Sequence, residues 1–138
     1  MKKIGIISCA NTTKVLDCPL SPCLQDFYDR KGAFARYRGK NAVLIGIVSC
    51  PGCLGGLAPE AFLAKAHSLV HYGAQASHLT YCMAILCPYA KRYAKMLKKR
   101  YPEIEVIPGT HEPHDSAQKT RESVSRFLVQ KIGSNIIP

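Results

Sequence analysis

The stretch AVLIGIVS at residues 42–49, followed at once by CPGC at residues 50–53, decides the fold class of this 138-residue chain. An uncharged run rich in Ile and Val is typical of a strand that is buried on both faces. Residues 4–8, IGIIS, repeat the pattern near the N-terminus, and both runs end in Ser-Cys. Strands of this kind form parallel sheets that helices cover on both sides, so the sequence predicts an α/β fold.

Two more β-type runs alternate with segments of helical period. The predicted strands are residues 4–8, 42–49, 77–81 and 105–108. The predicted helices are residues 23–37, 59–72, 88–101 and 116–131. Four strand–helix pairs in succession predict a small three-layer sandwich with a four-stranded, mainly parallel sheet, of the flavodoxin-like or half-Rossmann kind.

Length, composition and charge define the class of protein. The chain fits one α/β domain over residues 1–132 with a C-terminal tail at 133–138. Its net charge of +10 favours anionic partners. Residues 91–100 carry six basic side chains and no acid, but neither an aromatic stacking platform nor zinc-finger spacing accompanies them. Nucleic-acid binding is therefore disfavoured, and a solvated helix face is the preferred interpretation.

The sequence predicts a cytoplasmic protein that does not span a membrane. The apolar run behind Lys2 and Lys3 is shorter than the core of a signal peptide. The uncharged stretch at residues 42–59 is interrupted by Pro and Gly, unlike a membrane helix. Cytoplasmic thiols stay reduced, so the seven cysteines indicate metal or redox chemistry rather than a disulfide framework.

Chemically reactive residues follow each predicted strand. Cys9, Cys50 and Cys82 come directly after the first three strands, and His111 lies three residues beyond the end of the fourth. The carboxyl ends of parallel strands share one edge, which is where open α/β sheets bind ligands. The sequence therefore predicts a Cys/His site at this edge.

The remaining cysteines fall on segments that can reach the same edge. Cys53 forms a Cys-x-x-Cys pair with Cys50, and Cys87 precedes the proline that opens the third helix. Such a set of thiols and imidazole is what zinc binds. Whether Cys18, Cys23 and His114 join the site is left open.

Several of these motifs together resemble the CGGC-domain family. The matching segments are Cys50-Pro51-Gly52-Cys53 after a strand, Gly32-Ala33-Phe34, Cys82 through Cys87-Pro88, and Gly109-Thr110-His111. This small prokaryotic family is described as metal-binding, with zinc suggested by its Cys and His content. The resemblance implies Cys9, Cys50, Cys53, Cys82, Cys87 and His111 as the family's site positions. The central motif departs from the family at Pro51, where the family has Gly.

Three functions remain open at this point. The first is a zinc-binding protein with Cys50, Cys53 and Cys82 as ligands and Cys9, Cys87 or His111 completing the set. An iron–sulfur protein in electron transfer or sensing uses the same thiolates. A thiol-dependent enzyme would use the Cys50/Cys53 pair, with Cys50 as nucleophile and His111 as base. Residues 8–13, rich in hydroxyls between a strand and a helix, favour a small anionic ligand, although they lack the glycine of phosphate loops.

Overall fold

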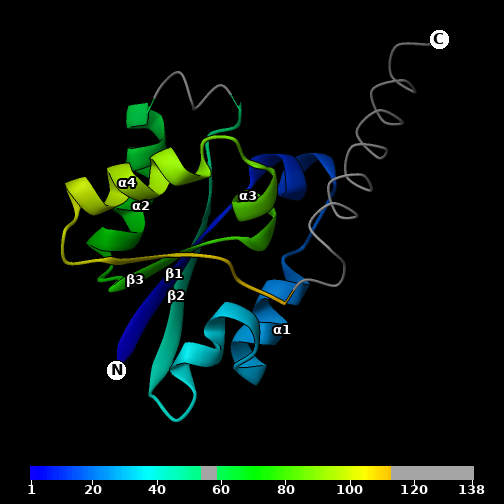
Figure 1. The fold of residues 1–138 in the computed structure, drawn as a ribbon, viewed down its shortest axis with the longest axis vertical. Helices are drawn as coiled ribbons and strands as arrows, with labels where there is room; N and C mark the ends of the chain where they lie inside the picture. The colour runs from blue at the N-terminus through cyan, green and yellow to red at the C-terminus, as the bar shows by residue number, and fades with distance from the viewer. Residues whose placement is uncertain (54–58, 113–138) are drawn as a thin grey trace.

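A computed structural model describes residues 1–53 and 59–112 of the chain (Figure 1). The helix predicted at residues 116–131, the tail at 133–138 and His114 lie outside these residues. Four parallel strands form the sheet: β1 (Lys2–Ser8), β2 (Ala42–Ser49), β3 (Ala76–Leu79) and β4 (Glu105–Pro108). Their spatial order is β2-β1-β3-β4, so the parallel α/β prediction is confirmed.

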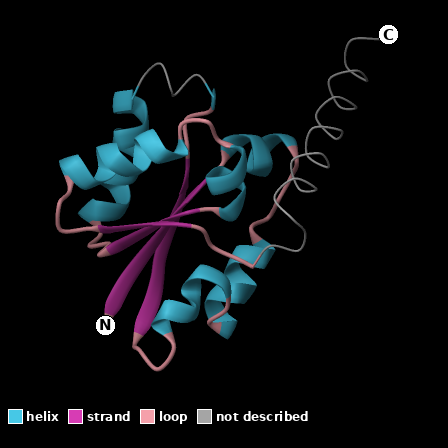
Figure 2. Ribbon diagram, viewed as in Figure 1, coloured by secondary structure: helices cyan, strands magenta, loops and turns pink. Residues whose placement is uncertain are grey.

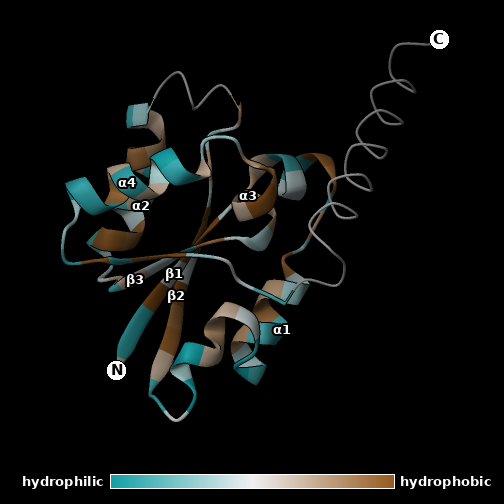
Figure 3. Ribbon diagram, viewed as in Figure 1, coloured by the Kyte–Doolittle hydropathy of each residue, from teal (hydrophilic) through white to brown (hydrophobic). Residues whose placement is uncertain are grey.

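Helices cover the two faces of this sheet (Figure 2). On one face lie α2 (Pro59–His71) and α4 (Ala90–Arg100), with the ring of Phe62 stacked on that of Tyr93 at a centroid distance of 3.9 Å. The other face carries α1 (Ser21–Asp29) and a 3₁₀ helix, η2 (Gly32–Tyr37). Hydrophobic residues lie along the strands between these layers (Figure 3).

Alternate side chains of β1 point to opposite faces of the sheet, so this strand contributes to both hydrophobic cores. Ile4 and Ile6 belong to the core under α1 and η2, whereas Ile7 belongs to the core under α2 and α4. Gly5 faces α2 closely, because a Cβ placed there would lie 2.7 Å from Leu69 Cδ1. Small residues on this face let the helix approach the sheet.

The structure corrects the predicted helix at residues 23–37, which is two elements rather than one. The break occurs at Arg30, whose backbone takes a left-handed φ of 54° while its N–H bonds back to carbonyls of α1. Its guanidinium donates to the carbonyls of Phe27 and Ala42 and lies over the Phe27 ring. Interactions with distant residues therefore end the helix where a periodic pattern alone would continue it.

Two short elements were not predicted. A π-helical turn, η1 (Asn11–Val15), follows β1, and α3 (Tyr81–Leu86) follows β3. Each is too short to show a hydrophobic period. Because α3 begins at Tyr81, β3 ends at Leu79, two residues before the predicted end.

One polar group is buried beneath η2. His78 in β3 has no exposed surface, and its ring nitrogens bond to the Tyr37 hydroxyl and the Gly109 carbonyl, each at 2.8 Å. Burial lowers the pKa of His78 to about 4, so the ring is neutral at pH 7. Both ring nitrogens are thus satisfied inside the fold, so the role of His78 is structural.

Within residues 1–53 and 59–112, no helix has the length and apolar character needed to cross a bilayer.

Candidate functional site

The strand order determines which cysteines meet at the carboxyl edge of the sheet. Cys9 follows β1, Cys50 follows β2, and Cys82 lies in the first turn of α3 directly after β3. Because β1 runs between β2 and β3, Cys9 lies between the other two cysteines. The backbone continues this pairing beyond the strands, since the Cys50 N–H donates to the Ser8 carbonyl at 2.8 Å.

Hydrogen bonds join these three cysteines, here called the sulfur trio. The thiols of Cys50 and Cys82 both bond to the sulfur of Cys9. Each outer member has a further partner: the Ala10 N–H donates to Cys50 Sγ at 3.3 Å, and Thr80 Oγ1 lies 3.1 Å from Cys82 Sγ. The trio is thus hydrogen-bonded to residues that directly follow β1 and β3.

Two further thiols lie beside the trio. Cys53 is exposed, and its sulfur accepts a hydrogen bond of 2.8 Å from the Asn11 side-chain amide. Cys87 lies between α3 and α4, and burial raises the pKa of its thiol. All seven cysteines are free thiols.

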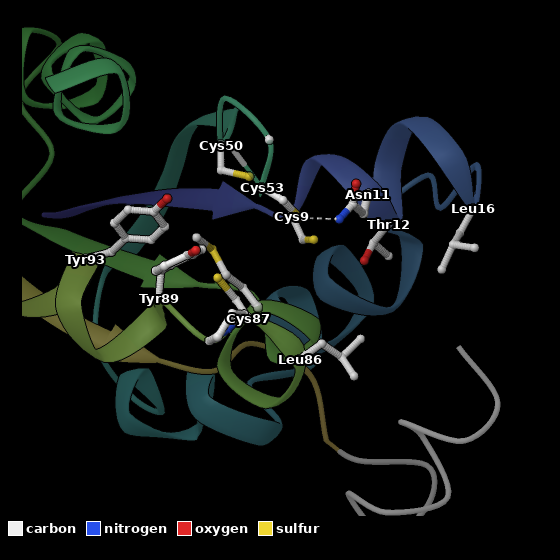
Figure 4. A pocket seen from close by; sticks show the side chains of 13 residues that line it. Cys9, Asn11, Thr12, Leu16, Cys50, Cys53, Leu86, Cys87, Tyr89 and Tyr93 are labelled. Carbon is white, nitrogen blue, oxygen red and sulfur yellow. Dashed lines mark hydrogen bonds between the residues drawn. The ribbon is translucent and has the colours of Figure 1, made fainter. Parts of the chain in front are cut away.

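A cavity of about 220 Å³ opens among these groups (Figure 4). One part of its wall carries sulfur and polar side chains: Cys9, Asn11, Thr12, Cys50, Cys53 and Cys87. The other part is hydrophobic or aromatic: Leu16, Met83, Leu86, Pro88, Tyr89 and Tyr93. Gly52 completes the lining. The cavity wall therefore combines thiols with mainly apolar and aromatic side chains.

Comparison with protein families gives one result that covers most of the chain. A family model described as the CGGC domain matches residues 3–111. The chain belongs to the CGGC domain family. No curated protein and no solved structure matches it significantly. The family match supports a metal-binding role in the general sense, without identifying the metal.

In this CGGC domain, hydrogen bonds within the trio favour ionisation of Cys9 over that of the other two cysteines. Hydrogen bonds from Cys50 and then from Cys82 lower the pKa of Cys9 well below the usual range of a thiol, and Thr12 adds donors from its hydroxyl and backbone. The same bonds, together with burial, raise the pKa of Cys50 and Cys82. The shifts have opposite directions, so Cys9 is the member of the trio that loses its proton most readily.

The donors of the CGGC domain fit a thiophilic metal by their chemistry. Cys9 contacts both Cys50 and Cys82, and the cavity that Cys9 and Cys50 line also carries Cys53 and Cys87, whereas Cys82 is not part of its lining. Thiols of this kind are the ligands that zinc and iron–sulfur clusters use. Their arrangement is that of hydrogen-bonded thiols. Among the residues that the structure describes, no group of three or more Cys, His, Asp or Glu side chains is positioned as a metal-coordinating set.

The other predicted candidates gather apart from the cavity. The His111 ring packs on Tyr81 with centroids 4.7 Å apart, and its Nδ1 lies 2.7 Å from the Glu112 carbonyl oxygen. The backbone N–H of His111 bonds to the sulfur of Cys23, which also lies 3.1 Å from Thr110 Oγ1. Cys18, Cys23 and His111 are not among the residues that line the cavity.

Four residues of this site are not apparent from sequence: Asn11, Thr12, Tyr89 and Tyr93. The segment at residues 8–13 was interpreted as a place for a small anion. In the structure its donors bond to sulfur instead, with Asn11 on Cys53 and Thr12 on Cys9. The sequence feature that points to Asn11 and Thr12 is their position, two and three residues after Cys9 at the end of the first strand. Tyr93 reaches the cavity from the buried face of α4.

Proposed function

We propose that this CGGC-domain protein binds a thiophilic metal ion, zinc in the first instance, through Cys9, Cys50 and Cys82. Cys53 and Cys87 are the sulfur donors available to complete the set. The observation that carries the proposal is the contact of Cys9 with both Cys50 and Cys82, which brings thiols from the ends of three strands together.

The protonation of the trio supports this assignment. Hydrogen bonds from Cys50 and Cys82 lower the pKa of Cys9, and metal binding at the other two cysteines would release their protons, as it does at thiol sites generally. Zinc held by thiolates supplies either a structural cross-link or, with an open position, a Lewis acid. His111 is not part of the proposed set, because its ring packs on Tyr81.

Elemental analysis and absorption spectroscopy test the proposal, on protein purified without oxygen or chelators. The wild type should carry about one colourless zinc ion per chain. Cys9→Ser should lower zinc affinity by at least about 100-fold. Cys18→Ser is the matched control, because Cys18 does not line the cavity, and it should retain the metal.

Two results would contradict this function. A metal-free wild type with its fold intact by circular dichroism would exclude metal binding. Full zinc occupancy in Cys9→Ser would exclude the trio as the ligand set. Iron with sulfide and a brown colour would replace zinc by the iron–sulfur alternative, at the same thiols.

A second candidate is thiol chemistry centred on Cys9. The hydrogen bonds that Cys9 accepts make it, rather than Cys50, the anionic sulfur on the cavity wall. Cys9 should therefore be the first site that iodoacetamide alkylates in metal-free protein at pH 5, as peptide mass mapping would show. Preferential alkylation of Cys50 under those conditions would contradict this assignment.

A further inference from the structure

We infer that the cavity beside the sulfur trio is a binding site for a small, uncharged and mainly apolar organic molecule. The inference deepens the proposed function in that it names the ligand class that would meet the sulfurs. It is carried by the charge, the hydrogen bonding and the shape of the cavity wall.

The first observation concerns charge. Among the residues that the structure describes, the lining contains no Lys, Arg, His, Asp or Glu side chain, although the chain as a whole carries a net charge of +10. A charged ligand would lose its hydration on entry without finding an oppositely charged lysine, arginine or carboxylate. The cavity thus selects against the anionic ligands that the basic surface would otherwise attract.

The second observation concerns the polar atoms of the wall. The Asn11 amide donates to Cys53 Sγ, and the Thr12 hydroxyl and N–H bond to Cys9. These donors are already used within the protein. Most of the remaining lining is sulfur, hydrocarbon or aromatic carbon, which rewards apolar surface more than hydrogen-bonding groups.

The third observation concerns shape. Tyr93 is held by its stack on Phe62, and the Tyr89 ring lies 6.1 Å from that of Tyr93, so two aromatic side chains form part of the wall (Figure 4). The volume of about 220 Å³ exceeds the roughly 150 Å³ of an engineered apolar cavity that accepts benzene. A substituted benzene ring is therefore within the size range.

Three isosteric probes test the inference: benzamide, benzoate and benzamidine, which have similar shapes and charges of zero, minus one and plus one. Each is titrated into ¹⁵N-labelled full-length protein, and backbone amide shifts are followed by NMR. Benzamide should shift the amides of cavity residues such as Asn11, Thr12 and Tyr93, with a dissociation constant on the order of 1 mM. Benzoate should bind at the same residues at least about tenfold more weakly, and benzamidine no more tightly than benzamide.

Cavity-filling substitutions locate the probe. Leu86→Trp should weaken benzamide binding at least about tenfold, because the indole occupies the cavity. Ala84→Trp is the matched control, since Ala84 lies on the same helix, is exposed and does not line the cavity. Leu16→Trp approaches from η1 and provides a second test if Leu86→Trp does not fold.

The outcomes separate this inference from the proposed function. Absence of benzamide shifts at the cavity, or tighter binding of either charged probe there, would overturn the inference. If Ala84→Trp weakened benzamide binding as much as Leu86→Trp does, the cavity would not be the benzamide site. Zinc content is measured on the same wild-type sample, so a protein that binds zinc but not benzamide refutes only the inference. A protein that binds benzamide but no metal refutes only the metal proposal.

Discussion

The face under α1 and η2 and the carboxyl edge at the sulfur trio both place polar groups inside the protein, but they use them differently. Under η2, the ring nitrogens of His78 bond to Tyr37 and Gly109, and the ring lies against Phe34 with centroids 4.6 Å apart. At the edge, Asn11 and Thr12 bond to sulfurs that line a cavity. Buried polar groups thus stabilise the layers in one region and hold reactive thiols in the other.

The largest expected effect comes from Phe34→Ala, because Phe34 has no exposed surface and contacts both Phe27 and His78. The substitution should lower the free energy of unfolding by about 4 kcal/mol, as measured by urea denaturation. Tyr28→Ala is the control, since Tyr28 is 75% exposed on α1, and it should change stability by less than about 0.5 kcal/mol. Similar losses of unfolding free energy in both variants would mean that Phe34 is not tightly packed between the sheet and these helices.

The pH dependence of stability should be the next largest effect. His78 has a pKa of about 4 in the folded protein, below the value of about 6.5 in the unfolded chain. The unfolded chain therefore binds more protons between these values, and stability falls as the pH is lowered from 6.5 to 4, by about 2–3 kcal/mol from this group.

Urea unfolding at several pH values tests that expectation. His78→Asn should remove this part of the acid sensitivity, although it destabilises the protein at pH 7. His71→Gln should leave the pH profile unchanged, because His71 is exposed. An unaltered profile in His78→Asn would show that the buried histidine is not the titrating group.

A third prediction concerns the contact between η2 and the end of β4. Both Gly32 and Gly39 have positive φ, at 54° and 69°, but only Gly32 is crowded: a Cβ there would lie 2.5 Å from the Thr110 carbonyl oxygen. Gly39→Ala should cost about 1 kcal/mol for its backbone conformation alone. Gly32→Ala should cost about 2–3 kcal/mol because the backbone must also shift. Equal losses in urea denaturation would refute a close contact here.

The smallest effect is expected from Cys53→Ala, because Cys53 is exposed at the edge. Its free energy of unfolding should change by less than about 0.5 kcal/mol. Cys23→Ala is the matched comparison: Cys23 is buried against Thr110, and its loss should cost about 1–2 kcal/mol. Thermal or urea unfolding of metal-free protein measures both. A larger loss in Cys53→Ala would show that the edge also stabilises the fold.

The fold could be predicted from sequence where a pattern of hydrophobic residues extended over a long continuous stretch. The run at residues 42–49 was predicted with its observed bounds, and the alternation of strands and helices predicted the parallel sheet. The break at Arg30 could not be predicted, because it depends on bonds from Arg30 to Ala42, twelve residues away. Nor could η1 and α3, whose lengths of five and six residues carry no period.

By itself, the sequence determined that cysteines follow successive strands, and therefore that thiols collect at one edge of a parallel sheet. It could not determine which of them touch, because that depends on the lateral order of the strands. Only the tertiary structure, with β1 between β2 and β3, places Cys9 between Cys50 and Cys82 and directs Asn11 and Thr12 to sulfur. The physical reason is that residue types and periods are local, whereas hydrogen bonding and charge at the site arise from residues far apart in the chain.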